Sequence, residues 1–179
     1  MEGRPTAEDH QVVVALGSNL GDRLGHLSFA VGRLEEEGFA LDALSSVFET
    51  PAVGYRDQPD FLNMVTAGRT GLDPVGLLAL LQSIEEDAGR KRAFANAPRT
   101  LDMDLVFFKG RIVREAGLTV PHPRWKERSF VVRPLQSLCP DLVDPETGLR
   151  VDEVSRTWPQ EPEQIREVLR GVEFPRTGG

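Results

Sequence analysis

Short apolar segments alternate with two amphipathic stretches, and their order limits the possible folds more than any other feature of the sequence. Four segments have the length and apolar content typical of strands: 11–16, 39–48, 61–66 and 101–108. Helical spacing of apolar residues fills the two longest intervals between them: 24–34 and 74–88. The order β-α-β-β-α-β predicts an α+β fold with a ferredoxin-like core. In it, helices pack on an antiparallel sheet to give three α-β-α layers.

The connection from the first strand to the first helix reads Gly17–Asp22 (GSNLGD). It resembles a phosphate-binding loop only superficially, because it lacks the glycine spacing and the lysine of such loops. We interpret it as a structural turn in which Asn19 or Asp22 caps the helix. The second helix has a clearer start at Asp73-Pro74, since Asp is a good cap and Pro suits the first helical position.

Outside this core, the sequence predicts short helices at 130–138 and 163–169. We expect a polar N-terminal extension over 1–10, a single domain over 11–154, and a C-terminal extension over 155–179. The C-terminal extension is predicted to be partly helical and then disordered, because it ends in Pro and Gly.

Composition excludes several classes of protein. The 179 residues carry 21 Lys and Arg against 28 Asp and Glu, a net charge of −7, which disfavours binding to nucleic acid or to an anionic membrane. No run of 18 apolar residues is present, and the N-terminus lacks an apolar signal core. The single cysteine, Cys139, excludes an intrachain disulfide and a multi-cysteine zinc site. A cytoplasmic location is therefore expected.

A pair of acidic residues opens the fourth predicted strand, in the segment Arg99–Asp104 (RTLDMD). Alternate residues of a strand share a face, so Asp102 and Asp104 point the same way, about 7 Å apart along the strand. Oxygen ligands of this kind suit Mg²⁺, which shares its coordination sphere with water and substrate phosphates. An exposed strand face with two acids is the alternative. The apolar residues 105–108 that follow make the strand central and favour a metal site.

Two basic segments accompany the acidic pair. Arg90, Lys91, Arg92 and Arg99 lie within ten residues, although the chain is acidic overall. Cations beside two carboxylates are what a complex of metal and polyphosphate requires. The alternative is a solvated loop whose cations pair with the acidic residues at 85–87.

The second basic segment, 122–130 (HPRWKERSF), adds a further possible phosphate-binding wall. It contributes Arg124, Lys126 and Arg128, and it begins with His122 held between two prolines. A loop histidine without a task is the alternative for His122.

A third candidate site lies on the third predicted strand, where Phe61 and Asn63 share a face. An aromatic ring and an amide two residues apart can stack on a planar heterocycle and hydrogen-bond to its edge. Taken alone the signal is weak, because aromatic residues on strands usually belong to the core.

Four segments together resemble 6-hydroxymethyl-7,8-dihydropterin pyrophosphokinase, a family of folate biosynthesis. They are ALGSNLGD (15–22), ETPAVGYRDQPDFLN (49–63), APRTLDMDLV (97–106) and VPHPRWKERSFVVRPL (120–135). The resemblance runs from about residue 12 to about residue 148. It implies an ATP-dependent transferase that moves the diphosphate of ATP to the hydroxymethyl group of the dihydropterin and releases AMP.

The resemblance also implies roles for individual residues. Two Mg²⁺ ions are expected at Asp102 and Asp104. Nucleotide contacts are expected from Gln82, Glu85, Arg99, Leu105, His122 and Arg128. Pterin contacts are expected from Thr50, Pro51, Val53, Phe61, Asn63 and Phe130. Arg90 and Arg92 match the arginines of the family's catalytic loop, which is expected to close over ATP. The expected partners are ATP and the pterin alone, bound by a monomer.

The loop before Arg99 departs from the family pattern. Ala95 replaces an arginine, Asn96 an aromatic residue and Ala97 a glycine, and only Phe94 offers another ring. Closure is therefore expected to depend on Arg90 and Arg92 more than on stacking. The competing hypothesis is a ferredoxin-like module that binds a ligand or RNA without catalysis. It is disfavoured by the single tyrosine, the net charge and the aspartate pair.

Overall fold

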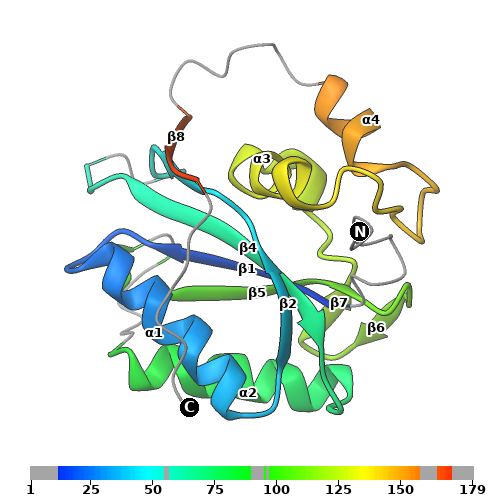
Figure 1. Cartoon of the computed structure of the whole chain (residues 1–179), viewed down its shortest axis with the longest axis horizontal. Coiled ribbons are helices and arrows are strands. Elements are labelled where there is room, and N and C mark those ends of the chain that lie inside the picture. The colour runs from blue at the N-terminus through cyan, green and yellow to red at the C-terminus, as the bar shows by residue number, and fades with distance from the viewer. Residues whose placement is uncertain (1–11, 55–56, 90–94, 96, 158–164, 171–179) are drawn as a thin grey trace, which may run out of the picture.

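The central sheet of the computed structural model has six strands and confirms the antiparallel α+β fold (Figure 1). The structure describes residues 12–54, 57–89, 95, 97–157 and 165–170. The strands are β1 (Val12–Ser18), β2 (Ala40–Leu44), β3 (Val47–Thr50), β4 (Phe61–Arg69), β5 (Asp102–Phe108) and β8 (Arg166–Leu169). Their order is β5-β1-β4-β3-β8, with β2 also paired to β4, and every pairing is antiparallel.

Helices cover both faces of this sheet, as the predicted three layers require (Figure 1). One face carries α1 (Arg23–Glu36) and α2 (Pro74–Asp87). The other carries α3 (Ser129–Leu138), with α4 (Val151–Arg156) packed beside it. A small hairpin of β6 (Val113–Glu115) and β7 (Leu118–Val120) follows β5, and the 3₁₀ helix η1 (Trp125–Glu127) leads into α3.

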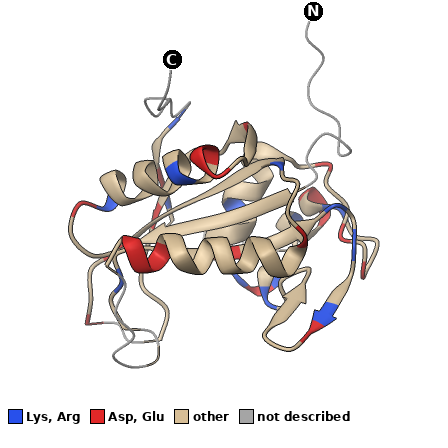
Figure 2. Cartoon of the chain, turned by 90° about the horizontal axis from the view of Figure 1, so that it is seen from below, with Lys and Arg blue, Asp and Glu red and all other residues tan. Residues whose placement is uncertain are grey.

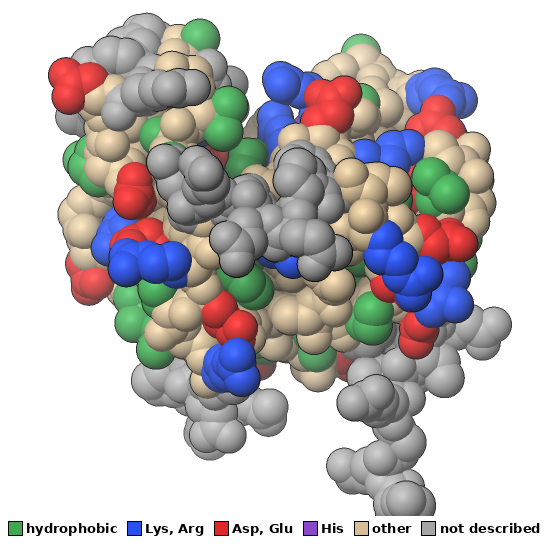
Figure 3. All heavy atoms as spheres, turned by 90° about the horizontal axis from the view of Figure 1, so that it is seen from above, with side chains coloured by type: hydrophobic (Ala, Val, Ile, Leu, Met, Phe, Trp, Pro, Cys, Tyr) green, Lys and Arg blue, Asp and Glu red, His purple; other side chains and the backbone are tan. Residues whose placement is uncertain are grey.

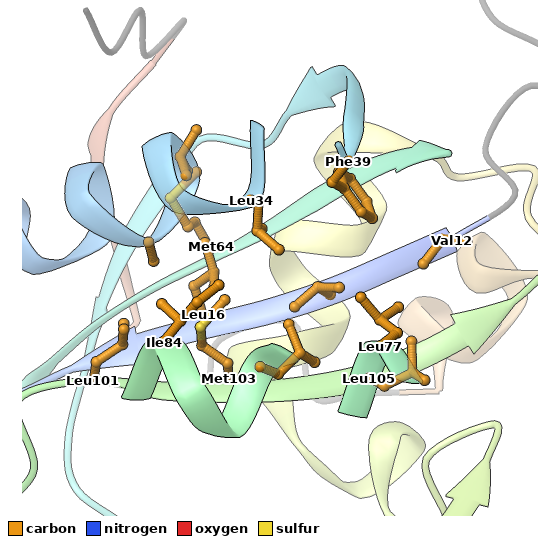
Figure 4. Close-up of a cluster of buried hydrophobic side chains, with 14 of the residues drawn as sticks. Val12, Leu16, Leu34, Phe39, Met64, Leu77, Ile84, Leu101, Met103 and Leu105 are labelled. Atoms are coloured by element: carbon orange, nitrogen blue, oxygen red, sulfur yellow. The ribbon is translucent and has the colours of Figure 1, made fainter. Parts of the chain in front are cut away.

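The sheet has a hydrophobic core on each face because successive side chains point in opposite directions. Val12, Val14 and Leu16 of β1 join the core beneath α1 and α2, which Figure 4 shows. Val13 and Ala15 join the second core, beneath α3 and α4. The strands of a sheet buried on both sides read as continuous apolar runs, which explains the sequence of β1.

The helix boundaries follow the capping residues. The Asp22 side chain accepts a hydrogen bond from the Gly25 amide, and Asp73 accepts one from Gly76. Pro74 occupies the first turn of α2. These local signals confirm the predicted starts, since such caps satisfy amides that have no partner inside the helix.

The prediction of one strand over 39–48 is wrong, because the strand is interrupted at Ser45 and Ser46 and forms two strands, β2 and β3, that run in the same direction along β4. The Ser45 amide donates to the Val65 carbonyl, and the Ser45 hydroxyl accepts from the Val65 amide. β2 therefore pairs with the end of β4 and β3 with its beginning. The partner that fixes this break lies 20 residues away, beyond the reach of local sequence patterns.

The predicted helix over 163–169 is also wrong in the part that the structure describes, where Arg166–Leu169 form strand β8. This strand pairs with β3, and Arg166 forms an ion pair with Glu49. A free strand edge offers unpaired backbone groups to such a segment, which outweighs a weak helical preference. The helix α4 was not predicted. The division into residues 1–10, 11–154 and 155–179 stays a prediction.

Charged side chains of opposite sign lie next to one another on the face that Figure 3 shows. Among the ion pairs of the described residues, Arg150 pairs with Asp141 and Asp152, and Arg156 also contacts Asp152. In the described residues, no helix is both long and apolar enough to cross a membrane.

Candidate active site

A pocket of about 390 Å³ opens on the α3 side of the sheet, where β3, β4 and β5 meet the start of α3. Most of the predicted site residues line it: Thr50, Pro51, Val53, Phe61, Asn63, Arg99, Asp102, Asp104, Arg128 and Phe130. Segments that are distant in the sequence therefore come together as expected from the three separate motifs.

The two aspartates lie on the pocket face of β5, opposite small residues of β1. Asp102 pairs with Gly17 and Asp104 with Ala15, which leaves room above the sheet. Arg99 Nη1 lies 3.7 Å from Asp102 Oδ2, and Arg128 Nη1 lies 3.4 Å from Asp104 Oδ2. The side chains of Asp102 and Asp104 are 25% and 34% exposed, respectively. Each carboxylate thus has a cation beside it, which offsets the repulsion within the acidic pair.

The donor set fits a metal that is completed by substrate. Among the described residues, no group of three or more His, Cys, Asp or Glu side chains is arranged to hold an ion. Two carboxylates on one strand face, open to a pocket, match the way Mg²⁺ binds through one or two carboxylates, waters and phosphate oxygens. Asp102 and Asp104 are therefore suitable ligands for Mg²⁺ only together with a phosphate-bearing ligand.

The aromatic part of the pocket contains a short polar chain. Asn63 Nδ2 donates to Thr50 Oγ1 at 2.6 Å, and both residues are buried. This bond fixes the Asn63 amide at the floor of the pocket. Phe61 and Phe130 line the same pocket as these groups, so aromatic rings and a fixed amide are brought together in it.

Arginine side chains connect the aromatic and acidic parts. The Arg99 guanidinium lies 5.4 Å from the centre of the Phe61 ring, and that of Arg128 lies 5.5 Å from the Phe130 ring. Arg99 Nε is buried and has no hydrogen-bond partner among the described residues. Leaving a buried donor of this kind unsatisfied is costly, which favours a movement of the Arg99 side chain that gives it a partner.

His122 borders the site through the loop after β7. Its amide donates to the Val106 carbonyl of β5, and its Nδ1 accepts from the Arg124 amide at 3.1 Å. Burial, followed by the charges of Arg128 and Arg124, lowers the pKa of His122 to about 4, although Asp102 acts in the opposite direction. At neutral pH the ring is therefore neutral, and its proton lies on Nε2 because Nδ1 is an acceptor.

The remaining predicted nucleotide contacts lie away from the pocket lining. Glu85 is buried near the end of α2 and accepts from the Met103 amide at 2.8 Å, while Gln82 is exposed on the same helix. Figure 2 shows the acidic residues of α2 gathered at one end of the helix, which is its C-terminal Glu85–Asp87. Local helix electrostatics disfavour acids at this end, so the arrangement favours a role beyond helix stability.

The predicted nucleotide contact of Leu105 stays a prediction, and its side chain does not line the pocket. The side chain is buried in the core beneath α1 and α2, as Figure 4 shows. Strand alternation places it on the opposite face of β5 from the two aspartates. Only backbone atoms of Leu105 remain for a nucleotide contact. The loop residues Arg90, Arg92, Phe94 and Asn96 lie outside the described part of the chain.

Two further pocket residues, Glu127 and Ser129, were not selected from the sequence. Arg124, Glu127 and Ser129 line the pocket, and Arg124 contacts Glu127 at 3.4 Å. Only Arg124 had been placed in a possible phosphate-binding wall. All three belong to the segment 122–130. Their position within this segment is the sequence feature that could have identified Glu127 and Ser129 as pocket residues.

A buried cluster holds this wall in place. Trp125 Nε1 donates to Asp144 Oδ2, and Lys126 Nζ lies 3.4 Å from the same oxygen. Burial alone would raise the pKa of Asp144, but hydrogen bonds from the Glu146 amide and Trp125, together with Lys126, hold it below its usual range. Lys126 thus stabilises the segment 122–130 through its ion pair with Asp144.

Comparison with known families gives an independent result. The family described as 7,8-dihydro-6-hydroxymethylpterin-pyrophosphokinase (HPPK) matches residues 13–140, a span that contains every predicted site residue. The chain belongs to this family. HPPK membership confirms the resemblance found in the four sequence motifs.

Relatives differ in how much of their length the chain spans. It is 41% identical over 149 residues to the 2-amino-4-hydroxy-6-hydroxymethyldihydropteridine pyrophosphokinase of Bacillus subtilis, which covers 82% of this chain and 89% of the relative. It is 38% identical over 144 residues to the folic acid synthesis protein fol1 of Pneumocystis carinii, covering 80% of this chain but 20% of that protein. The chain thus spans one fifth of the fungal relative.

Solved structures support the fold. The wild-type HPPK-DHPS protein of Plasmodium falciparum aligns with a TM-score of 0.64 at 13% identity, covering 82% of this chain and 44% of that one. At this identity the match supports the HPPK fold alone.

Proposed function

We propose that this HPPK-family chain transfers the diphosphate of ATP to the hydroxymethyl group of 6-hydroxymethyl-7,8-dihydropterin in folate biosynthesis. The hydroxymethyl oxygen bonds to the β-phosphorus, and the bond from that phosphorus to the α,β-bridging oxygen breaks. AMP leaves with the electron pair, and the hydroxyl proton is released. The observation that carries this proposal is the pocket itself, where a slot for a planar ring adjoins an aspartate pair flanked by arginines.

The pterin occupies the aromatic part of the pocket. Phe61 and Phe130 contribute ring faces for stacking, and the Asn63 amide hydrogen-bonds to the heterocycle edge. Thr50 fixes the Asn63 side chain through their 2.6 Å hydrogen bond, which orients the amide before the ligand arrives. Pro51 and Val53 close the edge of the slot. Orienting the pterin in this way lowers the activation barrier for transfer. Phosphoryl-type transfer depends on aligning the attacking oxygen with the phosphate more than on a covalent intermediate with the protein.

The phosphates occupy the charged part. Asp102 and Asp104 would hold Mg²⁺, which would neutralise phosphate charge when bound. Arg99 and Arg128 turn from their carboxylate neighbours toward phosphate oxygens, for which guanidinium groups are well shaped. Neutral His122 donates a hydrogen bond from Nε2. Gln82 and Glu85 contact the nucleotide, as does the backbone of Leu105. Arg90 and Arg92 complete the charge neutralisation.

The proposed activity is tested by measuring AMP release with ATP, the dihydropterin and a titration of Mg²⁺. AMP is expected only when all three are present. Asp104→Asn should reduce turnover by several powers of ten while the fold is kept, because it removes the negative charge of a metal ligand. Asp141→Asn, at a side chain 73% exposed, is the matched control and should remain active. A wild-type protein that binds the pterin but releases no AMP would favour a non-catalytic binding module.

Two Mg²⁺ ions, a monomer, a cytoplasmic location and the absence of nucleic-acid and membrane partners remain predictions. Equilibrium dialysis with a non-hydrolysable ATP analogue counts the ions without turnover. Sedimentation of the purified chain gives its oligomeric state.

A further inference from the structure

Asn19 lies outside the pocket lining, yet its side chain connects three separate segments of the site. It follows β1 and is 1% exposed. Its Oδ1 accepts a hydrogen bond from the Arg99 backbone amide at 2.9 Å. The backbone amide of Asn19 in turn donates to the Arg99 carbonyl at 3.2 Å. Its Nδ2 donates to Gln58 Oε1 at 2.8 Å and to the Pro59 carbonyl at 3.0 Å.

The two segments that Asn19 holds carry opposite halves of the pocket. Residues 58–59 lead directly into Phe61, the aromatic wall, and Arg99 leads to the aspartates of β5. Neither segment is regular secondary structure, so no sheet or helix hydrogen bonds fix their positions. The bonds to Asn19 share that role with the bond from Arg23 Nη1 to the Asp60 carbonyl, because loop backbone that leaves water must find partners.

The chemistry of the side chain suits this task. A carboxamide offers one acceptor and two donors on a short stem, and here each side of the amide serves a different loop. Aspartate has the same shape but no donor, and alanine has neither group. The sequence had suggested only a structural turn with a helix cap at this point, and Asp22 forms that cap instead.

We propose that Asn19 is a positioning residue that sets Arg99 and Phe61 relative to each other, so that the phosphate and pterin halves of the site are aligned for transfer. The separation it maintains is that between the Arg99 guanidinium and the Phe61 ring, 5.4 Å. The expected effect of Asn19 on catalysis rests on the proposed function. The expected effect of Asn19 on the positions of the two loops does not.

Two variants separate the two sides of the amide. Asn19→Asp keeps the acceptor for the Arg99 amide and loses both donors to residues 58–59. It should raise the KM for the pterin on the order of tenfold and leave kcat within about twofold. Asn19→Ala loses both sides and should also lower kcat by on the order of tenfold to a hundredfold, because misplaced groups align poorly.

A double-mutant cycle tests whether Asn19 acts through Arg99. The kcat losses of Asn19→Ala and Arg99→Lys should be non-additive, since an arginine that is already misplaced has less to lose. Ser155→Ala is the control. It removes a part-buried hydrogen bond to Gln136, a residue that does not line the pocket, and its effect should add to that of Arg99→Lys. Additive losses for Asn19→Ala would overturn the proposal.

Hydrogen exchange at the Arg99 amide gives a readout that does not require activity. Asn19→Ala should speed this exchange, and Asn19→Asp should leave it protected. Equal exchange rates at the Arg99 amide in both variants would overturn the positional role, if the losses of activity also track only the lowered melting temperature of each variant. A wild type without AMP release would instead overturn the proposed function, and the exchange result would still decide the role of Asn19.

Discussion

Gly17 shows how one backbone position controls the polar edge of the pocket. A Cβ atom built at this residue would lie 2.8 Å from Asn63 Oδ1 and 3.5 Å from Phe61 Cδ1. The first distance is shorter than the contacts that real Cβ atoms make, so the Asn63 side chain would have to shift. Glycine in β1 therefore allows the Asn63 amide to lie against the strand and to keep its bond to Thr50.

We expect Gly17→Ala to weaken pterin binding about tenfold or more, because Asn63 must move and leave its hydrogen-bonding position. ATP affinity should change little, since the displaced amide lies in the aromatic half. Titration calorimetry with each ligand measures both effects. Gly71→Ala, where an added Cβ meets nothing within 4 Å, is the control. An unchanged pterin affinity in Gly17→Ala would show that Asn63 does not hold the ligand.

His122 makes the stability of the fold depend on pH. Its folded-state pKa of about 4 lies below the ordinary 6.5, so the unfolded chain binds a proton at a pH where the folded chain does not. Its contribution is fully present above pH 6.5 and is lost as the pH falls toward 4. His122→Asn can still accept from the Arg124 amide and should flatten this dependence. Urea unfolding of both proteins between pH 4 and 7 measures the difference, and parallel curves would contradict the assignment.

At the scale of elements, β8 completes the sheet through its antiparallel pairing with β3 and through a charged contact with Glu49. Glu49 of β3 lies between Arg166 of β8 and Arg23 of α1, and these arginines hold the pKa of Glu49 below its usual value, Arg166 first. The strand has only four residues, all exposed. An edge strand this short depends on every contact that it makes.

Arg166→Ala should release β8 from β3 while barely changing the melting temperature, because an exposed ion pair is worth at most about 1 kcal/mol. Hydrogen exchange over 166–169 should increase several-fold. Arg170→Ala is the matched control, since Arg170 pairs with Glu167 of the same segment and does not contact β3 through that pair. Equal exchange in the two variants would show that backbone pairing alone holds the strand.

For the whole molecule, the two cores have different relations to the site. The core beneath α3 positions Phe130 and Arg128 at the start of that helix, whereas the core beneath α1 and α2 supports the sheet from behind. Val31 of α1 and Val132 of α3 are 2% and 1% exposed, so they form a matched pair.

Val31→Ala and Val132→Ala should each destabilise the fold by roughly 1–3 kcal/mol, since each leaves a buried cavity. Only Val132→Ala should also weaken pterin binding, because α3 can shift relative to the sheet. Chemical unfolding and pterin titration on the same samples test this difference. Equal pterin affinities would show that α3 is fixed by other contacts, such as those of the Trp125–Asp144 cluster.

Much of this architecture could be predicted because it is encoded locally. Strand alternation placed Phe61 with Asn63 and Asp102 with Asp104, and caps located both long helices. What could not be predicted depends on distant partners. The break at Ser45 requires Val65, and β8 requires an edge more than 100 residues earlier in the chain. Asn19 appeared to be an ordinary turn residue because its partners belong to two other loops.

The outer edge of β5 links the site residues to the tendency of the protein to aggregate in concentrated solution. No other strand pairs with this edge within the described residues, and two site residues occupy its backbone groups. Glu85 binds the Met103 amide, and the His122 amide binds the Val106 carbonyl. Exposed edges invite pairing between chains, so these residues also act against aggregation. A Glu85 variant that seems catalytically weak therefore has to be assayed at several protein concentrations, with light scattering, before its loss is assigned to chemistry.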